Sequence, residues 1–213
     1  MGLSFVDMGF DFTCIIPLAA LILSVVNGFI LVWNFSRDKP KLAVAPVLPV
    51  VYQWFFSLPN GEYQGQKTRK YGFLAYLAIS NRGLRGVSVN SWHLYLKIAD
   101  KKSIELKPMS IPEPKIRLGQ SDHAKVYRVL GQKGQLFEGD MEVKAGISIS
   151  GFAYYIAEFY GGDKYNPQIV DGKAIGVVVV KSVFGNTAKT KIQFTENLDK
   201  AKMMIHDIDK IDL

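Results

Sequence analysis

Three histidines are the side chains in this sequence best suited to act as general bases or metal ligands near neutral pH. His93 alternates with a tyrosine and a lysine in a strand-like segment, which predicts a solvated strand face. His123 follows Asp122 in a polar stretch. His206 opens the segment HDIDKID, whose carboxylates could supply oxygen ligands to a divalent cation. Carboxylate-rich helix ends are usually solvated surface, so we expect no metal, and the His206 cluster and His123 remain an alternative enzymatic or metal-binding site.

The sequence contains none of the compact motifs that announce catalysis or cofactor binding. It has no phosphate-binding loop of the form G-x-x-x-x-G-K-[ST], no G-x-G-x-x-G and no nucleophile elbow. Neither C-x-x-C nor H-E-x-x-H occurs, and these are the common short zinc-binding patterns. We therefore expect a protein that is not an enzyme and that carries no cofactor.

Basic and aromatic side chains in three polar segments form the candidate contact surface. The segments are 60–70, 82–86 and 161–171, which we interpret as loops at the end of a rigid scaffold, where recognition residues are common. The cations could form one basic patch at one end of the domain. Such a patch is usually a solvated face, and a functional one would bind anionic lipid headgroups or an acidic protein partner. Strands with exposed aromatic pairs flanked by cations are absent, so nucleic acid is not an expected partner. The candidate contact residues are Lys67, Arg69, Lys70, Arg82, Arg85, Tyr160 and Tyr165.

One uncharged stretch near the start of the sequence determines where in the cell we expect the rest of the chain to lie. Residues 12–33, FTCIIPLAALILSVVNGFILVW, carry no charge, and as a helix they would extend about 33 Å, enough to cross the hydrocarbon core of a bilayer. The preceding residues contain no lysine or arginine, and no small-residue cleavage site follows, so the stretch does not read as a signal peptide. It is apolar all round, unlike the amphipathic helix of a soluble domain. We therefore predict a single transmembrane helix.

Charges flanking this helix predict its orientation. Arg37, Lys39 and Lys41 follow it, whereas the residues before it include only Asp7 and Asp11 as charged side chains. By the positive-inside rule the larger C-terminal part faces the cytoplasm, at the inner membrane of a bacterial cell. The expected organisation is an extracytoplasmic tail at 1–11, a transmembrane helix at 12–34, a charged stalk at 35–41 and a β domain at 42–213.

Composition limits what the extramembrane part can be. All 26 lysines and arginines follow residue 36, against 17 acidic residues, so this part is basic. The positive balance suits either contact with an anionic membrane surface or simple solubility. Cys14 is the only cysteine and lies inside the predicted span, so no intramolecular disulfide can form.

Period-two alternation of apolar residues predicts that the rest of the chain is mainly β. It is clearest in residues 71–80, 89–99 and 188–195, while 173–183 is apolar on both faces, as in a strand buried in a sandwich. Residues 147–159 also read as a strand, with a change of register at Gly151 that predicts a bulge. Further expected elements are an edge strand or extended lead-in near Pro46 and Pro49, short strands at 104–106 and 126–130, and a final helix capped by Asn197. We expect the aromatic run 52–56 to pack in the core, and its contact with the membrane interface is the alternative.

Six to eight short strands with turn-rich connections predict an all-β fold, a two-sheet antiparallel sandwich that is immunoglobulin-like in the broad sense. The segments YGFLAYLAISNRG, VNSWHLYLKIAD, SISGFAYYIAEF and VVVVKSVFGNTAKTKIQF follow one N-terminal span. In this arrangement the chain resembles a loose group of uncharacterised bacterial membrane-anchored β-sandwich proteins. The resemblance implies a topology and supplies no catalytic residues.

These observations together predict a single-pass membrane protein whose β-sandwich acts as a binding or assembly module. Its expected partners are the lipid bilayer through residues 12–34 and either anionic headgroups or another protein. A reversed topology, with the domain acting as an envelope-facing adhesion or surface module, is the main alternative. The sequence indicates neither the partner nor the oligomeric state.

Overall fold

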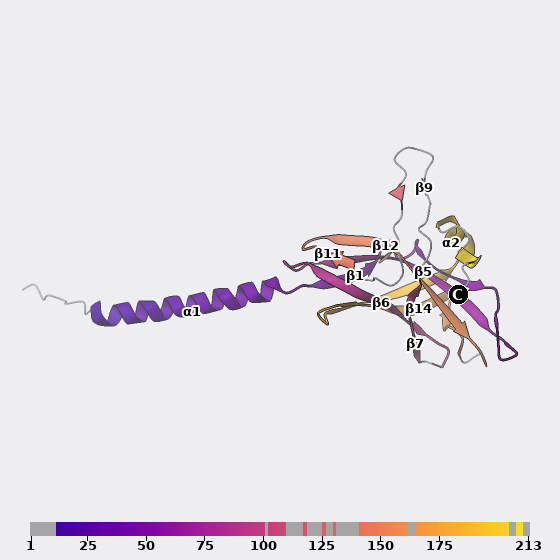
Figure 1. The fold of residues 1–213 in the computed structure, drawn as a ribbon, viewed down its shortest axis with the longest axis horizontal. Helices are drawn as coiled ribbons and strands as arrows, with labels where there is room; N and C mark the ends of the chain where they lie inside the picture. Colours follow the sequence, from indigo (N-terminus) through magenta and orange to yellow (C-terminus); the bar gives the residue numbers. More distant parts are fainter. Residues whose placement is uncertain are drawn as a thin grey trace, which may run out of the picture. The chain divides into compact units, whose positions relative to one another are not determined.

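The computed structural model describes residues 12–100, 102–109, 117–118, 125–126, 130, 141–161, 165–204 and 208–210 (Figure 1). The chain divides into two compact units, Met1–Lys39 and Pro40–Leu213. The second unit, here called the β domain, is mostly strand with a short C-terminal helix. The elements are α1 (Phe12–Asp38), β1 (Leu42–Pro46), β2 (Gln53–Leu58), β3 (Glu62–Tyr63), β4 (Gln66–Lys67), β5 (Arg69–Asn81), β6 (Val87–Lys97), β7 (Ser103–Leu106), β8 (Pro108–Met109), β9 (Arg117–Leu118), β10 (Lys125–Val126), β11 (Met141–Val143), β12 (Ser148–Phe159), β13 (Ile169–Val170), β14 (Lys173–Ser182), β15 (Thr187–Glu196), α2 (Leu198–Met204) and η2 (Ile208–Lys210).

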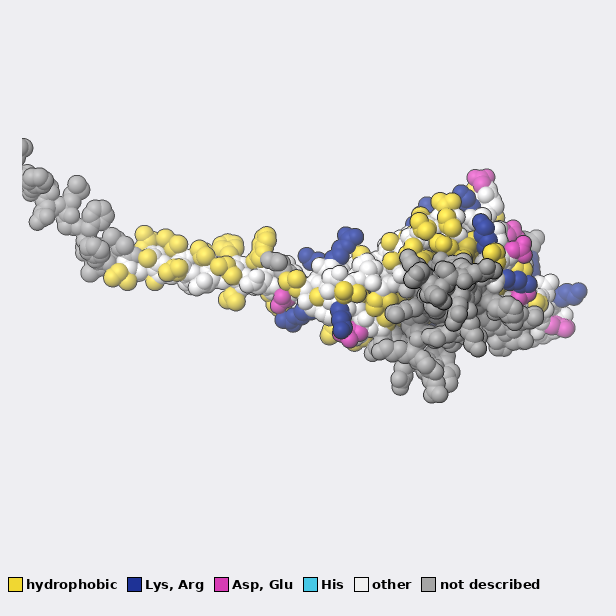
Figure 2. Space-filling model, turned by 90° about the horizontal axis from the view of Figure 1, so that it is seen from above, with side chains coloured by type: hydrophobic (Ala, Val, Ile, Leu, Met, Phe, Trp, Pro, Cys, Tyr) yellow, Lys and Arg dark blue, Asp and Glu magenta, His cyan; other side chains and the backbone are white. Residues whose placement is uncertain are grey.

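Helix α1 is one uninterrupted apolar helix of 27 residues. Its segment Ile16–Ser36 is long and apolar enough to cross a membrane, and the side chains there are exposed rather than packed in a core. Figure 2 shows hydrophobic side chains distributed along this helix. Pro17 is the sixth residue of α1, beyond its first turn, so the missing N–H removes one backbone hydrogen bond from the helix without ending it.

Most described strands of the β domain belong to one sheet that is nearly closed as a barrel. Its order is β11-β6-β14-β15-β2-β5-β12-β8, with β1 also paired to β5 and β7 to β6. All pairs in this sheet are antiparallel except β15–β2, where Thr195 lies opposite Trp54 and the strands run parallel. Because this pair joins what would have been two layers, the expected two-sheet immunoglobulin-like sandwich is not confirmed, whereas the β-rich fold is.

The inner core fills the space enclosed by the sheet. Tyr155 of β12 crosses it and donates a hydrogen bond to the carbonyl of Trp92 on β6, with 2.8 Å between the oxygens. The alternation expected for three strands is confirmed, because the predicted inward residues of 71–80, 89–99 and 188–195 are mostly buried here. They include Phe73, Ala75, Leu77, Ile79, Trp92, Leu94, Leu96, Ala188, Ile192 and Phe194.

A second core lies on the outer face of β2, β5 and β12, beneath α2 and η2. Trp54 and Phe56 pack there with Leu74, Tyr154 and the helix residue Met204. The aromatic run 52–56 therefore belongs to the cores, as expected, with Phe55 pointing into the inner one.

The second core also explains a prediction that is wrong. We expected a change of register at Gly151, yet β12 pairs with β5 from Ser148 to Phe159 without a shift. Odd-numbered residues such as Tyr155 face the inner core throughout, and Phe152 and Tyr154 face the second core. A strand buried on both faces mimics a bulge in the sequence pattern, because apolar residues then occupy consecutive positions.

Proline interrupts the edge of the sheet between β1 and β2. Both strands pair with β5, but residues 47–52 leave the ladder, and Leu48 takes a positive φ of 45°. The buried side chain of Gln53 fills the gap: its Nε2 donates to the carbonyls of Val47 and Tyr76, and its Oε1 accepts from the N–H of Tyr76. The expected edge strand near Pro46 is therefore β1.

The C-terminal helix is shorter than the pattern suggested. Asn197 caps it as expected, its Oδ1 accepting a hydrogen bond from the N–H of Lys200, 2.9 Å away. Helix α2 ends at Met204, and a 3-10 turn follows at Ile208–Lys210. The predicted strand at 104–106 is β7, whereas most of the strand expected at 126–130 lies outside the described residues.

Candidate functional site

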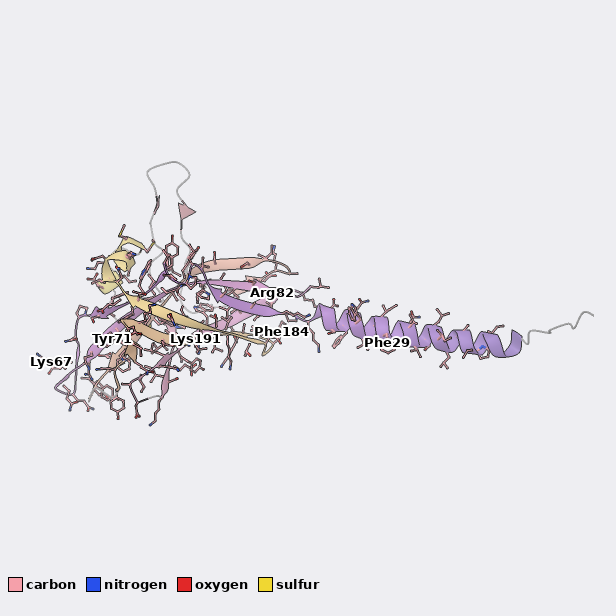
Figure 3. The ribbon with its side chains drawn as sticks, turned by 180° about the vertical axis from the view of Figure 1, so that it is seen from behind. Phe29, Lys67, Tyr71, Arg82, Phe184 and Lys191 are labelled. Atoms are coloured by element: carbon pink, nitrogen blue, oxygen red, sulfur yellow. The ribbon has the colours of Figure 1, made fainter. Side chains whose placement is uncertain are left out.

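The candidate contact residues lie at both ends of the β domain. We call the end where β1 begins and β5 finishes the entry end, because the chain enters the domain there, and the opposite end the far end. Arg82 and Arg85 follow β5 at the entry end, while Lys67, Arg69 and Lys70 precede or open β5 at the far end. Figure 3 shows Arg82 and Lys67 at opposite ends of the domain.

One basic patch, as the sequence predicted, is therefore not formed. Arg69 and Asn81 are the two ends of a continuous 13-residue strand. At about 3.3 Å per residue such a strand extends roughly 40 Å. The prediction failed because Lys67 precedes and Arg82 follows the same strand, and a strand separates the loops at its two ends by its full length.

At the far end the structure does bring the other predicted residues together. Arg69 donates a hydrogen bond from Nη2 to the carbonyl of Gly161 at 2.8 Å, which holds the segment after β12 against β5. The rings of Tyr63 and Tyr160 lie 5.3 Å apart between centroids. Tyr160 and Tyr165 are both exposed. We call this set the tyrosine surface: Tyr63, Lys67, Arg69, Lys70, Tyr160 and Tyr165.

Polar contacts beneath the tyrosine surface fix its shape. The buried Thr68 hydroxyl donates to a carboxylate oxygen of Glu158 at 2.7 Å, and the Lys70 ammonium lies 3.8 Å from the same oxygen. A Cβ added at Gly61 would come within 2.9 Å of the Thr68 hydroxyl, so only glycine fits without a shift. Side chains held in this way lose little entropy on binding, which favours recognition.

At the entry end, the buried side chain of Asn81 organises the loops. Its Oδ1 accepts hydrogen bonds from the N–H groups of Lys41 and Gly83, at 3.3 and 3.0 Å. Its Nδ2 donates to the carbonyls of Arg85 and Val143, at 2.6 and 3.1 Å. One amide therefore joins the chain before β1, the β5–β6 turn and the end of β11.

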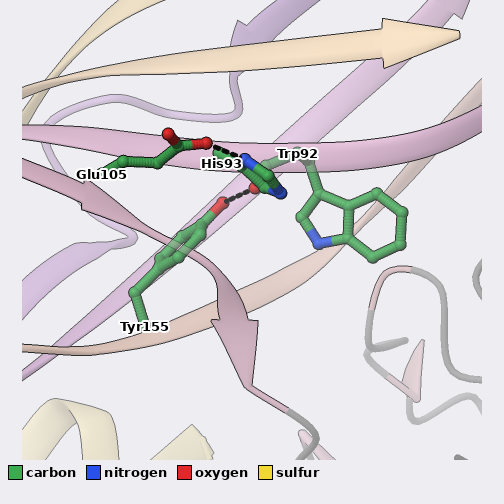
Figure 4. A network of polar contacts seen from close by, with 4 residues as sticks. All are labelled: Trp92, His93, Glu105 and Tyr155. Carbon is green, nitrogen blue, oxygen red and sulfur yellow. Dashed lines mark hydrogen bonds and ion pairs between the residues drawn. The ribbon is translucent and has the colours of Figure 1, made fainter. Parts of the chain in front are cut away.

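A polar cluster on the outer face of β6 holds the described side chains that are best suited to acid–base chemistry or ligand binding. His93 Nδ1 contacts the Glu105 carboxylate (Figure 4). The register of β6 and β7 places Glu105 opposite Tyr95. The adjacent Trp92 points into the core, and within the described part of the chain its buried indole N–H has no hydrogen-bond partner.

Hydrogen bonding shifts the ionisation of this cluster. The bond from His93, aided by a bond from Tyr95, lowers the pKa of the Glu105 carboxyl below its ordinary value. Burial together with Glu105 raises the pKa of the Tyr95 hydroxyl. Glu105 thus stays ionised while Tyr95 stays protonated, which suits a structural polar network that can also accept a ligand's hydrogen-bond donors.

A shallow groove of about 440 Å³ adjoins this cluster on β6, β14 and β15. Lysines rim it and valines form its floor, so it could hold an anionic or amphipathic group. Its lining includes no serine or cysteine, and Thr187 supplies the one aliphatic hydroxyl. The lining residues are Tyr95, Val177, Val179, Lys181, Thr187 and Lys189.

The other two histidines, His123 and His206, lie outside the described residues. Within the described part of the chain no three His, Cys, Asp or Glu side chains gather in a way that could hold a metal ion. His93 with Glu105 supplies only two ligands, fewer than a stable divalent site requires.

Sequence reasoning missed two features of the surface. Glu105 was not linked to His93, although counting the hairpin register back from the turn at 100–102 places it opposite Tyr95. The exposed apolar residues in the turns at the entry end were also missed. Their signal was the presence of leucine, isoleucine, valine and phenylalanine inside turn sequences, where polar residues are the norm.

Comparisons with known proteins give no family. No protein-family model matches the sequence, and no curated protein matches it. Among solved structures, the chain is similar to a Northeast Structural Genomics Consortium target, SoR45, at 10% identity and a TM-score of 0.32, over 76% of this chain and 90% of that one. It is also similar to the putative ApaA protein of Bordetella pertussis, at 10% identity and a TM-score of 0.31, over 76% and 98% of the two chains. Likenesses this low do not establish a shared fold.

Proposed function

We propose that this chain is a single-pass inner-membrane protein whose β domain acts at the cytoplasmic face as a binding or assembly module rather than as an enzyme. The observation that carries the proposal is α1, whose apolar side chains from residue 16 to 36 are exposed. Exposing such a surface to water is costly, about 25 cal/mol for each Å² of apolar area, whereas a bilayer would cover it.

The tyrosine surface supports binding of a protein partner. Tyrosine and arginine are enriched at protein interfaces, because each combines a large contact area with hydrogen-bonding groups. Tyr160 and Tyr165 are both exposed. The bond from Arg69 to Gly161 holds the segment beside Tyr160, and backbone bonding of residues 166 and 167 to the end of β6 holds the segment after Tyr165. The finer description as an immunoglobulin-like sandwich remains a prediction, and binding through loops at one end of the domain does not depend on it.

The first experiment tests anchoring and topology together. In a Cys14→Ser background, single cysteines replace Gln66, on the exposed β3–β4 hairpin, or Ser4, ahead of α1. Intact cells are treated with a membrane-impermeant thiol reagent and then lysed and treated again. We expect Cys at 4 to label in intact cells and Cys at 66 to label only after lysis.

Labelling of Cys at 66 in intact cells would overturn the proposed orientation and favour the envelope-facing surface module. Titration of the purified full chain with divalent cations separates the remaining alternative. A rise in melting temperature at micromolar metal would support a metal-binding or enzymatic domain, and we expect none.

Photo-crosslinking tests the tyrosine surface directly. A photoreactive phenylalanine analogue replaces Tyr160 or, as the matched control, Gln193, which is exposed on the outer face of β15. We expect a discrete protein adduct in cells from position 160 and none from position 193. Equal adducts from both positions, or none from 160, would contradict a protein partner at this surface.

A further inference from the structure

We propose that the entry end of the β domain is a second binding surface, which docks on an anionic lipid bilayer. The three turns at this end carry exposed apolar side chains surrounded by cations. This inference rests on the proposed function in one respect, because it requires α1 to hold the domain at a membrane.

The sheet register brings the three turns to one end. The β5–β6 turn, the β11–β12 turn and the β14–β15 turn meet because Val143 pairs with Val87, Ser148 with Ser80, and Ser182 with Val89. Figure 3 shows Arg82 of the first turn and Phe184 of the third at this same end.

Large apolar side chains are exposed in all three turns. Phe184 is 73% exposed, Leu84 55%, Val183 52% and Ile147 49%. Turn tips are normally polar, and a gathered set of exposed apolar residues marks an interaction site. Phenylalanine and leucine with polar neighbours are the residues that interfacial elements insert at the boundary of headgroups and acyl chains.

Charge at this end favours an anionic surface. Exposed cations surround the apolar tips, and among the described residues of these turns and the strand ends beside them Glu142 is the only acid. The far end, in contrast, mixes both signs, with Glu158 next to Lys70 and Asp100 next to Lys102. The cations of the entry end are Lys41, Arg82, Arg85, Lys144 and Lys181.

The turns are held in position before any contact is made. Asn81 binds the first two turns through its side chain and accepts a backbone bond from Gly146 at 2.9 Å. The third turn is tied to β6 by the bond from the N–H of Val183 to the carbonyl of Ser88 at 3.0 Å. A preformed surface binds without a large ordering cost.

Chain connectivity limits how far this end can be from the membrane. Helix α1 ends at Asp38 and β1 begins at Leu42, and four residue steps extend at most about 14 Å. If α1 spans the bilayer, the entry end is therefore held close to the headgroups. The aromatic run 52–56 cannot take this role, because Trp54 and Phe56 are buried.

Fluorescence of the full chain in nanodiscs tests the inference. In the Cys14→Ser background, an environment-sensitive dye is attached to a single cysteine replacing Phe184 or, as the control, Gln66 at the far end. Discs contain phosphatidylcholine alone or with phosphatidylglycerol, and brominated lipids serve as quenchers. We expect a blue shift and quenching at position 184 that increase with phosphatidylglycerol and decrease in high salt, and no change at position 66.

A charge variant measures the electrostatic part. Arg82 and Lys144 are exposed, so Arg82→Gln with Lys144→Gln should not disturb folding, which a thermal melt checks. Each cation near an anionic surface raises the equilibrium constant for docking by a factor of about five. Removing two cations should therefore lower the ratio of docked to free domain about 25-fold. Lys173→Gln with Lys191→Gln, exposed positions of β14 and β15 farther from the entry-end turns, is the matched control, and its ratio should stay unchanged.

The outcomes separate the two proposals. A chain that remains in the discs but shows water-like emission at position 184 in both lipids would overturn the docking inference and leave the anchor intact. A chain that does not enter the discs would overturn the anchor instead. A response that is independent of lipid charge would contradict the electrostatic role of the cations.

Discussion

Asn81 is the residue on which the entry end depends most. All four hydrogen-bonding positions of its amide are used, and they join the chain before β1 with two turns. Asn81→Ala leaves these backbone groups without partners in a buried place, so we expect a loss of about 2 to 3 kcal/mol in the free energy of unfolding. Urea unfolding measures it. Asn90→Ala, at an exposed position of β6, should change the same quantity by less than about 0.5 kcal/mol.

Glu105 gives the stability of the domain a pH dependence at the same scale. The hydrogen bond from His93 lowers the pKa of Glu105 in the folded state below the ordinary 4.5. The unfolded chain therefore binds a proton at a higher pH than the folded one, so the contribution of Glu105 is complete above pH 4.5 and is lost as pH falls through the folded pKa. Thermal melts should show that the melting temperature of the wild type is higher than that of Glu105→Gln at pH 7. The difference between the two melting temperatures should disappear in acid. Parallel profiles would contradict this role.

Helix α2 shows how much one short element can matter when it covers a second core. Met204 is buried against the outer face of the sheet, whereas its neighbour Met203 is 68% exposed. We expect Met204→Ala to cost about 2 to 3 kcal/mol, because it removes apolar contacts and leaves a cavity. Met203→Ala should cost less than about 0.5 kcal/mol in the same urea titration. Equal effects would mean that α2 does not pack as described.

The same second core marks the limit of what could be predicted from the sequence. Strands with one buried face, such as β6, were predictable because alternation directly reports the face that water contacts. Strand β12 was misread, since burial of both faces removes the alternation and α2, far away in sequence, supplies the second cover. Closure of the sheet was also missed, because the parallel pair β15–β2 joins residues about 140 apart and no local pattern encodes it. At the candidate site, the residues within each loop were predictable, but which loops share an end depends on strand direction.

At the scale of the whole molecule, the two units should differ in what they need to fold. The residues of both cores follow residue 40, and no described residue of α1 belongs to either. We therefore expect a fragment of residues 40–213, which keeps the bond from Lys41 to Asn81, to unfold cooperatively with the midpoint of the full chain in detergent. Met204→Ala should lower the free energy of unfolding of this fragment by the same amount as in the full chain. Near-ultraviolet circular dichroism and urea titration check both points. A fragment without fixed aromatic signals would show that the β domain needs the helix or the bilayer to fold. That dependence would then be expected at the entry end, because the chain passes there from one unit to the other.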